Sequence, residues 1–344
     1  MTRRRVTTSI ALAGLLGLAG CARELPVAPE PVIDMHVHAT TADGEGPPPL
    51  GICVPFYPQM PAFDPQRDGD WEDVFVGRFK EPPCADPIWS PTTDEELLTR
   101  TLAVMEERNV IAVASSFPDL ARQWARAAPD RFIAAVDPDL GTAVLPPETV
   151  REALASGDFS VIAEMSFQYL GVPPDDPMLE PYWALAEELD IPVGLHMGEG
   201  PPGATYLLPG YRVRLSHPVL LEEVLGRHPG LRVYVMHYGT PFVDEMIGML
   251  QNYPQLHVDI GGMTWVYPRD YFYQQLKEMT DAGFGDRIMF GSDGLVWPEL
   301  MGVAIDVVNE APFLTEEQKR DILYHNAARF LRLSDEQIAN HHGG

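Results

Sequence analysis

The chain has 344 residues, of which 50 are acidic and 24 are Lys or Arg, so its formal net charge at pH 7 is −26. This charge argues against binding to nucleic acid and against attraction to anionic lipid, because both are themselves negatively charged. Hydrophobic residues make up 45% of the chain, which is ordinary for a globular protein and enough for a large core.

The first 20 residues (1–20) are typical of a signal peptide. Arg3–Arg5 form a positively charged N-terminal segment, and the apolar stretch 10–18 that follows it is too short to span a membrane. The sequence Leu-Ala-Gly that precedes Cys21 resembles the lipobox of bacterial lipoproteins, which implies cleavage before Cys21 and acylation of its thiol. We therefore expect an exported protein held by its lipid anchor at the bacterial cell envelope, facing the periplasm or on the outer membrane. The alternative is an ordinary signal peptide with an incidental cysteine.

A proline-rich tether is expected at 21–31, ahead of a barrel at 32–332 and a C-terminal tail at 333–344. Cys53 and Cys84 remain once Cys21 is acylated, and an exported protein meets an oxidising compartment. We predict that these two cysteines form a disulfide that ties down a long loop. The alternative is a pair of buried free thiols, and a zinc site is disfavoured because neither has the paired spacing of cysteine ligands.

The body of the chain alternates between patterns typical of buried strands and patterns typical of helices. Continuous apolar runs rich in Val and Ile predict strands at 32–38, 110–116, 132–137, 160–166, 192–197, 232–237, 256–260 and 288–292. Helices are expected from Thr93, which has capping-box spacing to Glu96, and at 118–128, 147–156, 178–190, 217–228, 241–251, 269–281, 299–309 and 315–332. Eight strand–helix pairs predict a (β/α)8 TIM barrel. An open doubly wound sheet is the alternative, but the first strand is not followed by a glycine-rich phosphate loop.

Two connections are longer than is usual in such folds: 40–91 after the first strand and 199–216 after the fifth. Both would emerge at the carboxyl ends of the strands, where barrel enzymes carry their sites. We interpret them as a partial lid that selects substrate, the alternative being loops that only plug the barrel. Arg212 and Arg214 could pair with a substrate carboxylate, or simply form a solvated loop face.

Five of the predicted strands end in side chains that bind metals. His36 and His38 are two residues apart, so both point to the same face of one strand, where a buried His-x-His pair is costly unless a metal satisfies it. Asp34, on the same face, is expected to orient them. The remaining strand-end candidates are Glu164, His196, His237 and Asp293. Singly, each has an ordinary alternative: a satisfied core histidine, a distant salt bridge or a turn aspartate. Together they predict one metal site, because a barrel gathers its strand ends.

The order His-x-His, Glu, His, His, Asp resembles the amidohydrolase superfamily, and the runs 34–38, 291–293 and 324–331 resemble its amidohydrolase-2 branch. The resemblance covers residues 32 to about 332. It implies that one divalent metal is held by His36, His38 and Asp293 and a second by His196 and His237, with Glu164 bridging them. Glu164 stands where many members carry a carboxylated lysine. In the decarboxylase members one zinc suffices, and the residue matching His237 is an acid/base.

The leading hypothesis is a metal-dependent hydrolase that uses a metal-bound hydroxide on a small-molecule amide, ester or lactone, with one or two divalent metals per chain and zinc as the expected ion. Asp293 would accept the proton of the water and pass it on, and His237 or His196 would polarise the carbonyl if one metal is present. The alternative is a mononuclear-metal, non-oxidative decarboxylase of a small unsaturated or aromatic acid, in which His237 delivers the proton. A non-catalytic barrel lipoprotein is a third possibility. The expected partners are a small-molecule substrate and, through the lipid anchor alone, a membrane.

Overall fold

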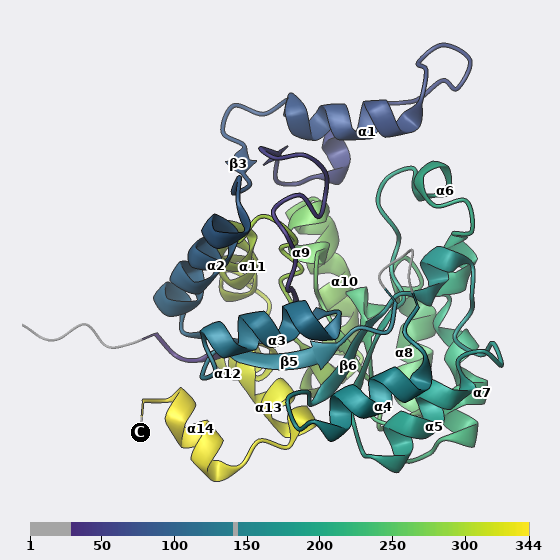
Figure 1. Cartoon of the computed structure of the whole chain (residues 1–344), viewed down its shortest axis with the longest axis vertical. Helices are drawn as coiled ribbons and strands as arrows, with labels where there is room; N and C mark the ends of the chain where they lie inside the picture. Colours follow the sequence, from purple (N-terminus) through teal and green to yellow (C-terminus); the bar gives the residue numbers. More distant parts are fainter. Residues whose placement is uncertain (1–28, 140–143, 344) are drawn as a thin grey trace, which may run out of the picture.

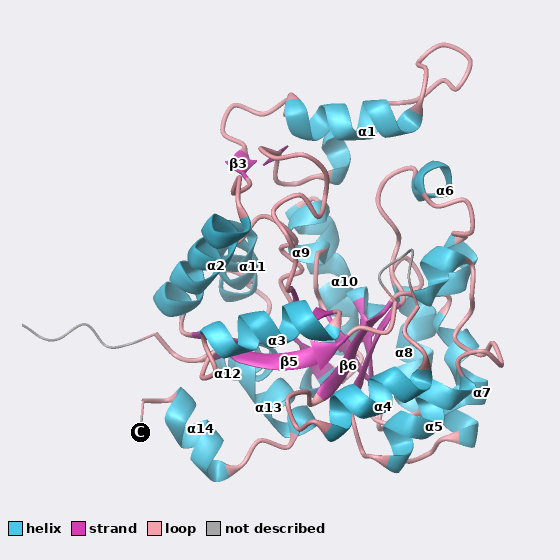
Figure 2. Cartoon of the chain, viewed as in Figure 1, coloured by secondary structure: helices cyan, strands magenta, loops and turns pink. Residues whose placement is uncertain are grey.

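Eight parallel strands form a barrel in the computed structural model, which describes residues 29–139 and 144–343 (Figures 1 and 2). The expected signal peptide and Cys21 lie outside these residues. In spatial order the strands are β1 (Val32–His38), β4 (Val110–Ser116), β5 (Phe132–Val136), β6 (Val161–Met165), β7 (Val193–His196), β8 (Val233–Met236), β9 (His257–Asp259) and β10 (Ile288–Met289). Each lies within the range expected from its apolar run.

Backbone hydrogen bonds join the last strand to the first. The amide of Met35 donates to the carbonyl of Phe290 at 2.9 Å, and the amide of Asp293 donates to the carbonyl of His36 at 2.8 Å. Because the ends of the sheet meet in this way, the sheet is a nearly closed barrel and the open-sheet alternative is wrong. The prediction of a (β/α)8 TIM barrel is confirmed.

Helices surround the strands and cover their outer faces (Figure 2). They are α2 (Asp94–Arg108), α3 (Pro118–Ala127), α4 (Pro147–Ala155), α5 (Glu180–Glu188), α7 (Glu222–Arg227), α8 (Val243–Asn252), α10 (Arg269–Asp281), α11 (Glu299–Asn309), α12 (Glu316–Arg320) and α13 (Asn326–Leu331). The Thr93 side chain accepts the amide of Glu96 at 3.2 Å, as the capping-box spacing predicts for the start of α2. A π-helical turn, Asp321–His325, joins α12 to α13 within the expected helix 315–332.

Further elements lie in segments expected to be loops or tail. The connection after β1 contains α1 (Trp71–Lys80) and an antiparallel pair of short strands, β2 (Gly51–Ile52) and β3 (Ile88–Trp89). The remaining additions are α6 (Ala204–Leu207), α9 (Met263–Val266) and α14 (Asp335–His341). Among the residues that the structure describes, no helix has the length and apolarity needed to cross a lipid bilayer.

Figure 1 shows both long connections on the same side of the molecule, beyond the carboxyl ends of the strands, and side chains join them there. A disulfide joins Cys53 to Cys84, with their Cα atoms 5.9 Å apart, and so closes the segment that contains α1. The Trp71 indole N–H donates to the carbonyl of Pro202 at 2.8 Å, and the Trp71 and Tyr206 rings both contact Phe63. We call the segments 40–91 and 199–216 together the lid.

Candidate metal centre

Glu164, at the end of β6, lies between two groups of histidines. Its Oε2 atom is 3.2 Å from Nε2 of His36 and 3.1 Å from Nε2 of His38. Its Oε1 atom is 2.6 Å from Nδ1 of His196 and 3.5 Å from Nε2 of His237. Each carboxylate oxygen therefore faces a different pair of imidazoles, which come from β1 on one side and from the ends of β7 and β8 on the other.

Asp293 completes the group around Oε2 of Glu164. Its Oδ1 atom lies 3.3 Å from Nε2 of His38 and 3.6 Å from Nε2 of His36. The residue follows β10 in the left-handed region, with φ of 49°, which turns its side chain over the end of the barrel. The structure thus brings together all six residues expected to hold metal.

Hydrogen bonds on the far sides of two rings fix which nitrogen faces Glu164. Nδ1 of His36 donates to Oδ2 of Asp259 at 3.1 Å, and Nδ1 of His237 donates to the Gly261 carbonyl at 2.8 Å. When the rings are neutral, the Nε2 atoms of both therefore present lone pairs to the Glu164 carboxylate. Lone pairs and anionic oxygens at this distance repel unless a cation or a proton lies between them. The site therefore fits a divalent cation, for which imidazole and carboxylate are common ligands.

The electrostatics of the site agree with this fit. Burial by itself lowers the pKa of His38, but hydrogen bonds and charge from Asp293 and Glu164 outweigh it and raise this pKa to about 10. Burial raises the pKa of Glu164, yet the His36 and His196 rings lower it well below its ordinary value. The carboxylates therefore stay ionised and draw positive charge into a buried position, which is what a cation site requires.

Two further aspartates position the candidate ligands. Oδ1 of Asp259 accepts the amide of His237 at 2.9 Å, so this one carboxylate contacts both His36 and His237. Oδ1 of Asp34 accepts the amides of His36 and Ser292 at 3.0 and 2.9 Å, which supports the orienting role expected for Asp34. Sequence reasoning missed Asp259, although it ends the seventh strand just before Ile260 and two glycines.

Glycines allow the backbone to approach the histidine rings closely. A Cβ atom at Gly198 would lie 2.6 Å from a ring carbon of His237, and one at Gly261 would lie 2.4 Å from Nδ1 of His36. Either position therefore excludes a larger residue. Gly198 follows His196 by two positions, and the His237 ring packed against it explains why this position holds no side chain.

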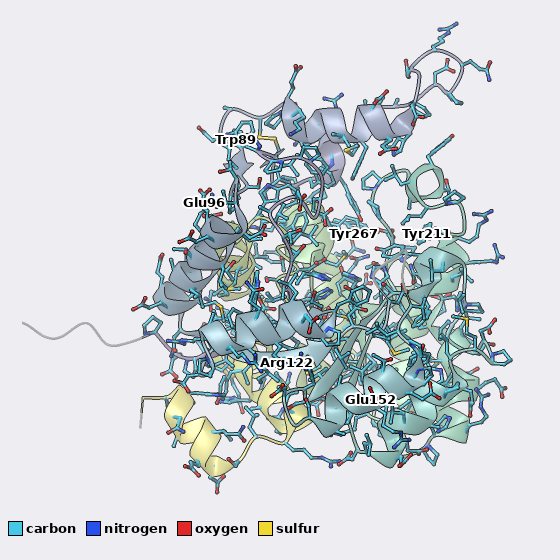
Figure 3. The ribbon with its side chains drawn as sticks, viewed as in Figure 1. Trp89, Glu96, Arg122, Glu152, Tyr211 and Tyr267 are labelled. Carbon is cyan, nitrogen blue, oxygen red and sulfur yellow. A yellow bond between two sulfur atoms is a disulfide. The ribbon has the colours of Figure 1, made fainter. Side chains whose placement is uncertain are left out.

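A cavity of about 560 Å³ is lined by all of the candidate ligands except His36, and we call it the mouth cavity. Candidate ligands form its floor, and lid residues such as Tyr57, Phe75 and Phe79 form its wall. Arg212 and Arg214, suggested as substrate-binding residues, are exposed and do not line it. The Arg212 guanidinium instead donates to the carbonyls of Pro209 and Tyr211. Figure 3 shows Tyr211 and Tyr267 between α1 and the strands.

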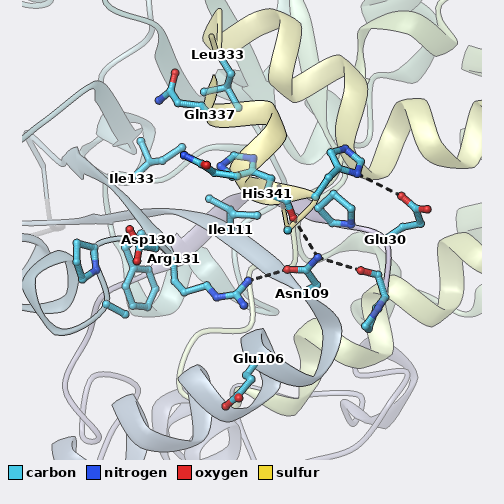
Figure 4. Close-up of a pocket in the computed structure, with 18 residues that line it drawn as sticks. Glu30, Glu106, Asn109, Ile111, Asp130, Arg131, Ile133, Leu333, Gln337 and His341 are labelled. Carbon is cyan, nitrogen blue, oxygen red and sulfur yellow. Dashed lines mark hydrogen bonds and ion pairs between the residues drawn. The ribbon is translucent and has the colours of Figure 1, made fainter. Parts of the chain in front are cut away.

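A second hollow, of about 1120 Å³, lies at the opposite end of the barrel (Figure 4). It is bordered by the residues just before β4 and β5 and by α14, and Asn109 in it accepts a hydrogen bond from Arg131 at 2.9 Å. None of the six candidate ligands lines this hollow. The mouth cavity is therefore the candidate active site, although it is the smaller of the two. It lies at the carboxyl ends of the strands, where barrel enzymes generally carry their active sites.

Comparisons with known proteins agree with this architecture. Protein fluG of Emericella nidulans is 23% identical over 160 residues, which cover 42% of this chain and only 18% of that protein. A probable 2-pyrone-4,6-dicarboxylic acid hydrolase from Acinetobacter baumannii has a similar fold, with a TM-score of 0.55, 16% identity and coverage of 88% of this chain and 99% of that one. A dihydroxybenzoic acid decarboxylase from Polaromonas sp., solved with bound manganese, has a TM-score of 0.54, 14% identity and coverage of 90% and 99%.

The sequence pattern of one protein family, amidohydrolase, matches residues 33–333. The match begins inside β1 and ends just after α13, so it includes every strand of the barrel and all six candidate ligands. The chain therefore belongs to the amidohydrolase family.

Proposed function

We propose that this protein hydrolyses a small-molecule amide, ester or lactone with the help of two divalent cations, zinc being the expected metal. The observation that carries the proposal is the position of Glu164. Its two oxygens divide the other ligands into one set formed by His36, His38 and Asp293 and a second formed by His196 and His237. A carboxylate in this position can act as a bridging ligand between two cations.

A cation bound there would polarise a carbonyl oxygen and lower the pKa of a water molecule. Asp293 is suited to the proton transfer, because its carboxylate lies at the floor of the mouth cavity and its pKa, which burial raises, is lowered overall by His36 and His38. It would take the proton of the attacking water as the new C–O bond forms. It would then give that proton to the nitrogen or oxygen that leaves as the scissile bond breaks.

The rival reaction is decarboxylation on one cation, with His237 delivering the proton. The similar structures named above include both a probable hydrolase and a decarboxylase, so their names do not decide between the two reactions. The position of His237 favours hydrolysis. Its Nε2 atom lies 3.0 Å from Nδ1 of His196 and 3.5 Å from Glu164, among the candidate ligands, and its Nδ1 atom is bound to the Gly261 carbonyl.

Metal analysis of the purified protein tests the proposal. We expect about two equivalents of metal per chain by plasma mass spectrometry, a marked loss in Glu164→Gln, and no loss in a control, His217→Gln, whose histidine lies outside the site. One equivalent per chain, together with release of CO2 from an aromatic acid, would instead establish the lyase.

We further propose that the mature protein starts at an acylated Cys21 and is anchored at the cell envelope. The disulfide between Cys53 and Cys84 supports export, because such bonds persist mainly in oxidising compartments. Intact-mass measurement should find the lipid on the mature chain, and Cys21→Ser should move the protein to the soluble fraction. An unmodified wild-type protein in that fraction would reject the anchor.

A further inference from the structure

We infer that the substrate is a non-acidic compound: an apolar body that is uncharged or carries a protonated amine, with no carboxylate or phosphate away from the reacting carbonyl. This inference rests on the proposed hydrolysis and concerns the substrate class of the same site. It follows from the charges and the aromatic side chains that line the mouth cavity.

The lining of the mouth cavity contains no lysine or arginine among the residues that the structure describes. Its basic side chains are His38, His196 and His237, all of which are candidate metal ligands. A substrate carboxylate distant from the metal would therefore find no guanidinium or ammonium partner. Binding an unpaired anion in a partly desolvated cavity is unfavourable.

Acidic side chains are abundant in the same lining. Besides Glu164 and Asp293, four carboxyl groups line the cavity, those of Glu45, Asp137, Asp139 and Glu199. Burial raises the pKa of Asp137 well above its ordinary value, and the nearby charge of Glu164 raises it further. Burial also raises the pKa of Glu199, although Tyr267 donates a hydrogen bond to it. These carboxyl groups therefore ionise reluctantly: a substrate anion would oppose their ionisation further, whereas an ammonium group would favour it and pair with the carboxylate formed.

Two basic side chains of the lid, Lys80 and Arg212, are engaged elsewhere. The Lys80 ammonium donates to the carbonyls of Pro47 and Pro49, and Arg212 donates to carbonyls of its own loop. Neither residue lines the mouth cavity. These two lid cations therefore hold the backbone of the lid itself.

The upper wall of the cavity is aromatic. Phe79 stacks on Phe56 with ring centroids 5.3 Å apart and on Trp297 at the same centroid distance, and Phe75 and Trp265 continue this wall. Such a wall removes apolar groups from water, and aromatic faces also attract cations. An apolar body with or without an amine is therefore matched to both the wall and the charge of the cavity.

The test uses three 4-nitrophenyl esters and the metal-loaded full-length protein. The acyl chains have equal length and end in a methyl, a trimethylammonium or a carboxylate group. We expect kcat/KM for the carboxylate ester to be at least about 10-fold below that of the neutral ester, equivalent to about 1.4 kcal/mol. The ammonium ester should equal or exceed the neutral one. A carboxylate ester cleaved as well as the neutral ester would overturn the inference.

Binding of the matching methyl ketones, measured by calorimetry, separates this inference from the proposed hydrolysis. If no ester is cleaved but the ketones bind in the expected order of charge, the hydrolase proposal fails and the charge preference stands. If esters are cleaved and the acidic ketone binds best, the hydrolase stands and the substrate class is wrong.

Charge reversal provides a second test that does not depend on the natural substrate. Glu45→Lys should raise kcat/KM for the carboxylate ester relative to the neutral ester by about 10-fold or more. The control is Glu152→Lys, on α4 away from the lid (Figure 3). Glu45→Gln should change the ratio of the two kcat/KM values in the same direction but by a smaller factor. This variant keeps the test valid if Glu45→Lys fails to fold. An unchanged ratio in both Glu45 variants would refute selection by cavity charge.

Discussion

Asp259 contacts two candidate ligands at once, the ring of His36 and the backbone amide of His237. A carboxylate in this position fixes the tautomer and orientation of an imidazole and increases its basicity toward a metal. Its geometry therefore matters for metal binding, although it is not a ligand in the arrangement described above. Sequence reasoning found the six candidate ligands because each lies at or near the end of an apolar strand. It missed Asp259 because one strand-end aspartate looks like a turn residue until its partners are known.

Asp259→Asn should weaken metal binding by about 10–100-fold, because an amide cannot hold the His36 ring as a carboxylate does. Titration against a competing chelator measures this change. Asp158→Asn, an exposed carboxylate near the start of β6, is the matched control. Unchanged metal affinity in Asp259→Asn would show that its contact with His36 has only a structural role.

Asp293→Asn should reduce kcat by about 10²–10⁴-fold, because the proton of the attacking water loses its acceptor. Circular dichroism and the amount of bound metal are measured in parallel, since Asp293 is also a candidate ligand. Asp286→Asn, an exposed residue just before β10, is the control. Turnover retained by Asp293→Asn would reject the proton-transfer role.

At the scale of elements, the strands and outer helices could be predicted because their periodic apolar faces are local properties of the sequence. The elements of the lid could not. Helix α1, for example, buries only two residues, Trp71 and Phe79, and its position depends on the disulfide and on rings from distant segments. The direction of Arg212 and Arg214 depends in the same way on the fold of their loop, so the sequence could not exclude them from the cavity.

The contact between α1 and α6 depends on a glycine. A Cβ atom at Gly203 would lie 2.0 Å from the Trp71 indole nitrogen, and the residue has φ of +72°. Gly203→Ala should therefore displace the two halves of the lid and raise KM several-fold, while bound metal stays the same. Gly226→Ala is the control, because nothing lies within 4 Å of its Cβ position in α7. Equal KM values for the two variants would contradict a role of this contact in substrate binding.

Removal of the disulfide should loosen the lid without opening the barrel. The double variant Cys53→Ser/Cys84→Ser should lose about 2–4 kcal/mol in free energy of unfolding, because the 31-residue separation of the cysteines is no longer constrained in the unfolded chain. Urea denaturation measures this loss. Reductant should destabilise the wild type and leave the double variant unaffected, and a response of both would point to a different thiol.

At the scale of the whole molecule, the six candidate ligands come from five separate strand ends and must be brought together by folding. Their carboxylates and imidazoles lie close together in the folded chain, so bound cations should stabilise the folded state. A chelator should therefore lower the melting temperature by about 5 °C or more, with recovery on adding metal back. Calorimetry with and without chelator measures this shift. An unchanged melting temperature after complete metal removal would argue against a preformed cation site.

The hydrogen bonds of Asp34 to the amides of His36 and Ser292 place the seam of the barrel directly beneath the candidate metal centre. Residues near both termini of the barrel therefore meet at the catalytic floor. During synthesis the donor set stays incomplete until the ribosome has made nearly the whole chain. Shortened translation products that end before Asp293 will lack both the seam and the last carboxylate. Metal binding should therefore distinguish full-length chains from such truncated ones.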